Sequence, residues 1–192
     1  MAKLYFYYAS MNAGKSTILL QSSFNYAERG MRTMLFTAAV DDRHAQGVIH
    51  SRIGLEASAI PFDAQTDLHA MVAAETEQEP VGCVLVDEAQ FLSRAQVFQL
   101  ARVCDELGVP VLCYGLRTDF QAELFEGSAT LLGIADSLQE IKTICSCGRK
   151  ATMNLRVDAG GHAITEGAQT EIGGNDRYVA LCRRHYMEQM GQ

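Results

Sequence analysis

The feature that most constrains the fold is a short turn that joins an apolar segment to a helical one near the N-terminus. Residues 3–9 are apolar almost throughout, as expected of a strand that is covered on both faces. A helical pattern follows the turn, runs to about residue 29 and stops at Gly30. The turn itself has the register of a phosphate-binding loop, whose pattern is G-x-x-x-x-G-K-[ST]. Its residues are Ala9, Ser10, Met11, Asn12, Ala13, Gly14, Lys15 and Ser16.

Such a loop binds phosphate for simple electrostatic reasons. Backbone N–H groups at the start of a helix point toward the anion, and the helix dipole favours its negative charge. Lys15 would contact the β- and γ-phosphates, and the Ser16 hydroxyl would coordinate Mg²⁺. Ala9 stands where the pattern has its first glycine, and alanine tolerates fewer backbone conformations. Gly-Lys-Ser at a helix start also occurs by chance, but its place directly after an apolar strand favours a nucleotide site.

A second apolar segment ends in two acidic residues. Residues 83–86 are all apolar, and Asp87 and Glu88 follow at once. A carboxylate at the end of such a strand supports Mg²⁺ in nucleotide-binding proteins. The alternative is a buried strand that merely ends in an acidic turn. The two motifs together, each on a strand of one sheet, predict that the chain binds ATP and Mg²⁺.

Strand and helix patterns alternate along the first three quarters of the chain. Further strands are expected at 32–38, 81–86, 109–116 and 138–144, with helices at 67–79, from Ser93 to Gly108, and at 124–135. This alternation predicts an α/β fold of the P-loop NTPase (RecA-like) type, a parallel sheet flanked by helices. Apolar residues make up 48% of the chain, enough for a sizeable core.

The pattern changes near residue 144, where the chain becomes rich in glycine, threonine and charge. We therefore predict a P-loop ATP-binding domain at 1–143 and a small zinc-binding lid, or lasso, domain at 144–192. The metal prediction rests on two pairs of candidate ligands. They are Cys145, Cys147, Cys182 and His185.

Four nitrogen and sulfur ligands suit a tetrahedral structural Zn²⁺. The single residue between the first two cysteines is less usual than a two-residue gap, so buried cysteines and a surface histidine are the alternative. In a reducing compartment such a cluster is more often metal-binding than disulfide-bonded. The other cysteines, Cys83, Cys104 and Cys113, lie in apolar patterns and are expected in the core.

The charge of the chain bears on its partners. The formal net charge of −7 argues against binding to a nucleic-acid backbone. Basic residues do flank the cysteines, at Arg149, Lys150, Arg183 and Arg184, but no aromatic residues alternate with them, so we expect a solvated face. We see neither a signal-peptide pattern nor a segment as long as a membrane span, and expect a cytoplasmic protein without a membrane partner.

The chemistry depends on the second acidic residue. Glu88 could take a proton from an attacking hydroxyl or water, so the chain is either a small-molecule kinase or an ATPase. A GTPase is disfavoured, because the sequence has no Asn-Lys-x-Asp motif. Two hypotheses remain: a kinase, or a P-loop ATPase coupled to a nucleic-acid-binding zinc ribbon.

Four sequence blocks resemble type II thymidine kinases, in particular their bacterial branch. They are residues 11–17, 87–91, 114–120 and 172–178, in the order of that family. The resemblance implies ATP-dependent phosphorylation of thymidine, and of deoxyuridine, at the 5′-hydroxyl, giving dTMP and ADP in deoxynucleotide salvage. It also implies a structural zinc, a homotetramer and feedback inhibition by dTTP.

The resemblance assigns roles to single residues. Glu88 matches the catalytic base, and Asp41 and Arg43 match an element near the phosphates and the metal. Ala89 and Gln90 complete the ATP and Mg²⁺ set. The nucleoside site is implied at Phe91, Leu116, Phe120, Phe125, Ile172, Gly173 and Tyr178. Asn154 departs from the animal members, which carry threonine close to the base.

A glycine-rich segment separates the two ligand pairs. Its five glycines, between residues 158 and 174, cannot support a continuous helix. We therefore predict a mobile lid over the nucleoside, held at both ends by the zinc site.

Overall fold

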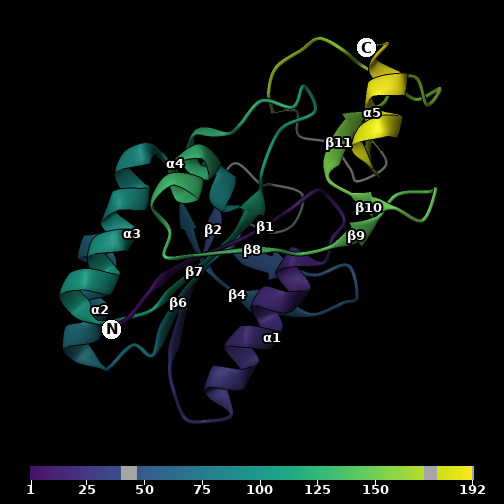
Figure 1. Cartoon of the computed structure of the whole chain (residues 1–192). Helices are drawn as coiled ribbons and strands as arrows, with labels where there is room; N and C mark the ends of the chain where they lie inside the picture. Colours follow the sequence, from purple (N-terminus) through teal and green to yellow (C-terminus); the bar gives the residue numbers. More distant parts are fainter. Residues whose placement is uncertain (40–46, 171–176, 192) are drawn as a thin grey trace.

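The computed structural model describes residues 1–39, 47–170 and 177–191 (Figure 1). Its centre is a six-stranded sheet in the order β5-β2-β6-β7-β1-β8, and every neighbouring pair is parallel. The strands are β1 (Leu4–Ala9), β2 (Thr33–Ala38), β5 (Ile60–Phe62), β6 (Cys83–Val86), β7 (Val111–Leu116) and β8 (Ser137–Glu140). The carboxyl ends of parallel strands share one edge of the sheet, so the segments after β1, β6 and β7 can form one site.

Helices cover both faces of the sheet (Figure 1). On one face α1 (Lys15–Ala27) buries Leu19 and Leu20 against residues of the inner strands. On the other, α2 (Leu68–Gln78), α3 (Arg94–Leu107) and α4 (Glu126–Ile134) bury apolar side chains in the larger core. The predicted α/β architecture is confirmed, and Cys83, Cys104 and Cys113 are buried as expected.

Local signals set the helix ends. Ser93 accepts a hydrogen bond from the backbone N–H of Gln96, whose side chain accepts one from the Ser93 N–H, so α3 begins with the predicted capping box. Gly108 ends α3, as predicted. Asp67 caps α2 through the N–H of Ala70.

The prediction of a single strand over residues 138–144 is wrong. The chain follows β1 only as far as β8, and the Ile141 N–H donates a last hydrogen bond to Tyr8. It then leaves the sheet, and β9 (Thr143–Ile144) pairs antiparallel with β10 (Lys150–Ala151). An edge strand has a neighbour on one side only, so the apolar pattern alone could not set where the pairing ends.

The C-terminal part has a small core of its own. There β11 (Met153–Arg156) pairs antiparallel with β12 (Tyr178–Leu181), and α5 (Arg183–Met190) packs against both. Figure 1 shows these elements gathered with β9 and β10 at one end of the molecule. Their buried core contains Cys145, Met153, Leu155, Leu181 and Tyr186, among others. The predicted boundary between residues 143 and 144 falls within β9, and the division into two domains stays a prediction.

Two further short strands, β3 (Val48–His50) and β4 (Glu56–Ser58), form a hairpin beside α1. Among the helices of the described residues, none has both the length and the apolar character needed to cross a bilayer.

Candidate active site and metal centre

The phosphate loop joins β1 to α1, and its backbone explains why alanine is accepted at its first position. Ala9 is the last residue of β1 and has no left-handed conformation. The loop instead turns at Asn12, with φ of 61°, and at Gly14, with φ of 81°. Glycine is favoured where the backbone is left-handed, and Ala9 is not, so alanine causes no backbone strain at this position.

The two nucleotide motifs meet at the carboxyl edge of the sheet. Lys15 is only 8% exposed, and its Nζ donates a hydrogen bond to the Ser10 carbonyl at 3.1 Å. The Ser16 hydroxyl, at the start of α1, donates to Oδ2 of Asp87 at 2.9 Å. The ammonium, the hydroxyl and the carboxylate thus face the same space, as the two motifs predicted.

The Asp87 carboxylate suits a divalent cation. Burial, and secondarily the neighbouring Glu88 carboxylate, raise the pKa of Asp87 to about 7, while Ser16 and Lys15 act in the opposite direction. A bound cation would favour the ionised form. Magnesium prefers hard oxygen ligands, and usually takes one or two from the protein with the rest from water and phosphate. The oxygens of Ser16 and Asp87 fit that requirement.

One cleft runs from the phosphate loop to a group of aromatic residues. Lys15, Ser16 and Glu88 line it together with Phe91 and Phe120. The rings of Phe91 and Phe125 meet edge to face, with centroids 5.9 Å apart and an angle of 75° between their planes. The same cleft therefore offers a phosphate site, a carboxylate and an apolar end with aromatic walls.

Asn154 connects the C-terminal part to this cleft. Its Oδ1 accepts a hydrogen bond from the Met11 N–H of the phosphate loop at 2.7 Å. Its Nδ2 donates to the Thr118 carbonyl, after β7, at 2.8 Å. The side chain is buried and lines the cleft. The sequence indicated only that this residue departs from a family pattern, because its two contacts lie too far away in sequence to leave a local signal.

Arg156 packs against Phe120 and Tyr178, two aromatic residues of the cleft, and the sequence did not predict a role for it. Its side chain is only 2% exposed, and its Nε donates to the Tyr178 hydroxyl at 3.0 Å. The guanidinium also donates to the carbonyls of Ala168 and Gln169. A buried arginine with several acceptors fixes the groups around it, because moving any of them leaves a buried charge poorly solvated.

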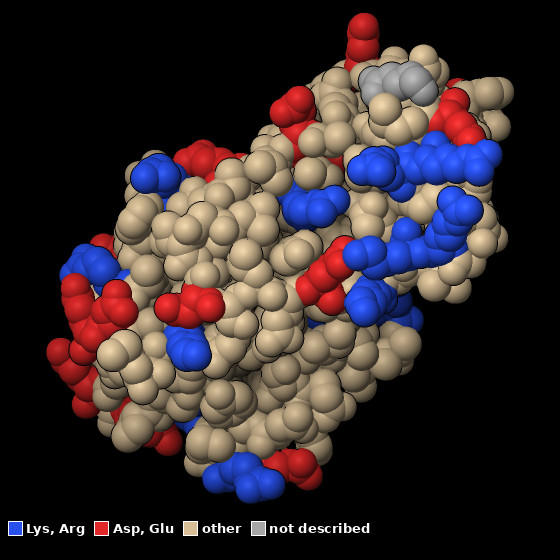
Figure 2. All heavy atoms as spheres, in the orientation of Figure 1, with Lys and Arg blue, Asp and Glu red and all other residues tan. Residues whose placement is uncertain are grey.

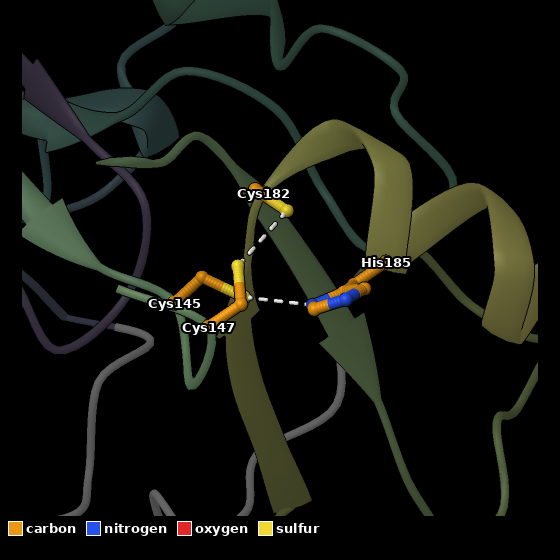
Figure 3. Close-up of side chains that lie close together, drawn as sticks. All are labelled: Cys145, Cys147, Cys182 and His185. Carbon is orange, nitrogen blue, oxygen red and sulfur yellow. Dashed lines mark hydrogen bonds between the residues drawn. The ribbon is translucent and has the colours of Figure 1, made fainter. Parts of the chain in front are cut away.

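The four predicted metal ligands lie together. Their ligand atoms are all within 4.8 Å of one another, with Cys147 on the turn after β9 and Cys182 at the start of α5 (Figure 3). The Cys147 and Cys182 sulfurs are 3.8 Å apart, and the Cys145 sulfur is 3.2 Å from Nδ1 of His185. Two sulfurs bound tetrahedrally at about 2.3 Å from zinc lie roughly 3.8 Å apart, so the spacing suits this ion.

Backbone groups favour a thiolate at this centre. The backbone N–H groups of Cys147 and Cys182 lower the pKa of Cys145 to about 5, and the His185 ring adds to the effect. A zinc ligand must be deprotonated, and a thiol with this pKa meets that condition at neutral pH. The four residues could therefore hold a structural zinc ion.

Comparison with known proteins identifies the family. The family model described as thymidine kinase matches residues 2–186. The chain belongs to the thymidine kinase family. It is 72% identical over 192 residues to a thymidine kinase of Novosphingobium aromaticivorans, with all of both chains covered. It is 66% identical over 190 residues to one of Zymomonas mobilis, covering 99% of this chain and 98% of the other. A thymidine kinase of Vibrio cholerae is 62% identical over 192 residues, again with all of both chains covered.

Membership of the thymidine kinase family confirms the resemblance seen in the four sequence blocks. Most of the site residues predicted from the sequence line the cleft. They are Met11, Asn12, Ala13, Gly14, Lys15, Ser16, Asp87, Glu88, Gln90, Phe91, Leu116, Phe120, Phe125 and Tyr178. Which of them contact thymidine or ATP stays a prediction.

Other predicted site residues of this thymidine kinase family member do not line the cleft. Ala9, Ser10 and Ala89 are buried beside the cleft and do not line it. Four more, Asp41, Arg43, Ile172 and Gly173, lie outside the described residues.

The basic residues near the metal centre form an exposed surface, as expected. Figure 2 shows lysine and arginine side chains gathered over the end of the molecule that carries β10 and α5. Arg149, Lys150, Arg183 and Arg184 are all exposed. Lys150 pairs with Glu140 at 2.6 Å and Arg184 with Glu188 at 2.7 Å, so part of this charge is neutralised locally.

Proposed function

We propose that the chain transfers the γ-phosphoryl group of ATP to the 5′-hydroxyl of thymidine, giving dTMP and ADP in deoxynucleotide salvage. One observation carries the proposal. A single cleft is lined by Lys15 and Ser16 of the phosphate loop, by the Glu88 carboxylate, and by aromatic residues that include Phe91 and Phe120. A nucleoside bound in this cleft could therefore contact the apolar surface with its base while its hydroxyl reaches the proton acceptor and the phosphate site.

The proposed reaction follows from the positions of these groups. Lys15 and the N-terminus of α1 hold the phosphates of ATP and stabilise the charge that develops on the transferred group. Ser16 and Asp87 would hold Mg²⁺, which would supply positive charge to offset the negative charge of the phosphates. Glu88 accepts the proton of the 5′-hydroxyl as its oxygen bonds to the γ-phosphorus and the bond to ADP breaks. Asp41 and Arg43 are proposed to assist near the phosphates.

The aromatic end of the cleft is proposed to bind the base. Phe91, Leu116, Phe120, Phe125 and Tyr178 supply apolar and aromatic surface. The backbone of Ile172 and Gly173 is proposed to complete the site. Deoxyuridine lacks only the thymine methyl group, and one such group is worth about 1–3 kcal/mol in an apolar pocket, so we expect it to be a weaker substrate.

The metal centre is proposed to be structural. Zinc held by Cys145, Cys147, Cys182 and His185 would tie the turn after β9 to the start of α5. No ligand position would remain open for a reacting group, which is typical of structural sites.

The remaining features of the proposal come from family resemblance. They are a homotetramer, feedback inhibition by dTTP, and a cytoplasmic location with no membrane or nucleic-acid partner. None of the six cysteines, all of which lie in the described residues, forms a disulfide, which fits a reducing compartment.

A panel of nucleosides tests the proposed function. ADP release is measured with ATP and Mg²⁺ alone, with each deoxynucleoside, and with single- and double-stranded DNA. We expect release that depends on thymidine, and more weakly on deoxyuridine, together with formation of dTMP. Release that depends on DNA and on no nucleoside would instead favour the ATPase with a zinc ribbon, for which the exposed basic surface is the one supporting observation.

A further inference from the structure

Gln90 lies two residues after Glu88, in the short turn η1 (Ala89–Phe91). Its side chain is only 2% exposed, although it lines the cleft. A buried amide is costly unless both its donor and its acceptor find partners. The neighbours of this amide therefore show what it does.

The two ends of the Gln90 amide join Glu88 to the central sheet. Its Nε2 donates a hydrogen bond to Oε2 of Glu88 at 2.5 Å. Its Oε1 accepts one from the Leu116 N–H, at the end of β7, at 3.0 Å. A donor on one carboxylate oxygen fixes the rotation of the whole carboxylate, since the group is planar. The carboxylate of the proposed base is thus held in a set orientation relative to β7.

The backbone of Glu88 is also held in an unusual conformation. Its φ of 53° is left-handed, a conformation that few residues other than glycine adopt. Such a conformation is strained and persists only where the surrounding contacts determine it. The Glu88 N–H donates to Oδ1 of Asp87, which is part of those contacts.

Two glycines allow η1 to pack closely against β7 and α4. A Cβ atom on Gly115, in β7, would lie 2.9 Å from Oε1 of Gln90 and 3.0 Å from its backbone nitrogen. A Cβ atom on Gly127, in α4, would lie 2.6 Å from the Ala89 carbonyl oxygen. The absence of both side chains lets β7 and α4 approach the turn from two sides. Movement of the turn toward β7 or α4 would therefore meet backbone atoms.

We propose that Gln90 is a positioning residue that orients the Glu88 carboxylate toward the acceptor hydroxyl. The inference rests on the proposed role of Glu88 as the base. Under it Gln90 acts through Glu88, and not on ATP or Mg²⁺ as the sequence blocks implied. Its loss then lowers the rate of phosphoryl transfer and leaves nucleotide binding unchanged.

The first measurement compares Gln90→Met with a matched control, Gln96→Met. Gln96 is also a glutamine with 2% exposure, and its amide caps α3 and bonds to the Asp63 and Thr66 carbonyls. We expect Gln90→Met to lower kcat about 10- to 100-fold, part of the roughly 100- to 10,000-fold that a general base contributes. The KM for ATP should stay within about twofold. Gln96→Met should lower the melting temperature and leave kcat unchanged.

A second variant separates the two hydrogen bonds and guards against a folding defect. Gln90→Glu keeps an acceptor for the Leu116 N–H but cannot donate to Glu88 while it is ionised. It should lose kcat as strongly as Gln90→Met. Normal kcat in Gln90→Glu would overturn the proposal, because it would show that only the bond to β7 matters. A rise in the KM for ATP of tenfold in either variant would also overturn it.

A double-mutant cycle with Glu88→Gln decides whether Gln90 acts through Glu88. Transfer of radiolabelled γ-phosphate measures the low rates. The proposal predicts that Glu88→Gln with Gln90→Met is within about twofold of Glu88→Gln alone. If the fold-losses in kcat of the two single variants multiply in the double variant, the role of Gln90 is refuted and Glu88 remains the base. Near-normal kcat in Glu88→Gln itself would refute the role of Glu88 as the base, and with it the role of Gln90 in positioning that base.

Discussion

Arg156 stacks on Phe120, with the central carbon of its guanidinium group 3.8 Å from the centre of the ring. Both side chains are buried. A desolvated cation over an aromatic face contributes about 2 kcal/mol or more. The same guanidinium donates to Tyr178 and to the carbonyls of Ala168 and Gln169. Arg156 therefore joins two aromatic residues of the cleft to the glycine-rich segment that follows β11.

Replacing Arg156 should weaken the binding of thymidine. Arg156→Lys keeps the charge, but an ammonium group lacks the planar fork that stacks on Phe120 and reaches several acceptors at once. We expect the KM for thymidine to rise about tenfold, equivalent to roughly 1.4 kcal/mol, with a smaller change in the KM for ATP. Arg184→Lys, on an exposed pair with Glu188, serves as the control and should change neither constant. A KM for thymidine within twofold of the parent in Arg156→Lys would contradict this role.

Arg156 also shows what the sequence could and could not predict. The phosphate loop, the acidic strand end and the α3 caps were predictable because each depends on residues within a few positions of one another. The contacts of Arg156 extend from Phe120 to Tyr178, and only tertiary packing brings them together. Asn154 is similar, since its two partners belong to segments that follow different strands of the sheet. The four metal ligands are as distant, but cysteine is rare enough for its spacing to be informative.

Glu88→Gln should separate binding from catalysis. Glutamine keeps the shape of the side chain and removes its ability to accept a proton, so nucleotide binding should persist while kcat falls by roughly 100- to 10,000-fold. Steady-state kinetics together with equilibrium binding of ADP measures both quantities. Lys15→Ala should by contrast weaken the ATP-dependent steps, because it removes the positive charge that stabilises the transferred phosphoryl group. A Glu88→Gln enzyme with near-normal kcat would rule out the proposed base.

Asn154→Asp tests the connection between the C-terminal part and the phosphate loop. Aspartate retains an acceptor for the Met11 N–H but loses the donor to the Thr118 carbonyl and adds negative charge beside the ATP site. An unsatisfied buried group costs about 1–3 kcal/mol, so we expect a lower melting temperature and a higher KM for ATP. Asn25→Asp, on the exposed face of α1, provides the control. If Asn154→Asp and Asn25→Asp have the same melting temperature and the same KM for ATP, the hydrogen bonds of Asn154 do not contribute to either property.

Freshly purified protein should contain one zinc ion per chain, measured by elemental analysis. Structural sites contribute on the order of 10 kcal/mol of apparent binding energy in small zinc peptides. Cys182→Ser should therefore lose the metal and loosen the elements around α5, while the parallel sheet keeps its secondary structure. Hydrogen exchange read separately for the sheet and for the C-terminal part distinguishes these effects. Active protein without metal would refute the zinc proposal.

The last prediction concerns the glycine-rich segment 158–174, of which residues 171–174 lie outside the described part of the chain. Its described portion contacts the loop after β7, which contributes to the cleft. Gln121 donates to the Thr165 carbonyl at 3.1 Å, and the Gln169 amide donates to Asp119 at 3.0 Å. A bound nucleoside that orders this loop should therefore also order the segment. A kinase needs such closure, because water that reaches the phosphates hydrolyses ATP without product.

Limited proteolysis can test the lid at a bond within its described portion. Segment 158–174 contains no lysine or arginine, so trypsin cannot cut inside it, whereas a glutamate-specific protease can cut after Glu166, which is exposed. We expect thymidine or dTTP to slow cleavage after Glu166 and ATP alone to slow it less, because only the nucleoside fills the aromatic end of the cleft. Cleavage after Glu28, exposed beyond the end of α1, reports on the protease itself and should stay constant. Anchoring of both ends by the zinc ligands limits the entropy lost on closure, so Cys182→Ser should weaken the protection by thymidine. Equal cleavage after Glu166 with and without nucleoside would show that the segment is an ordinary surface loop.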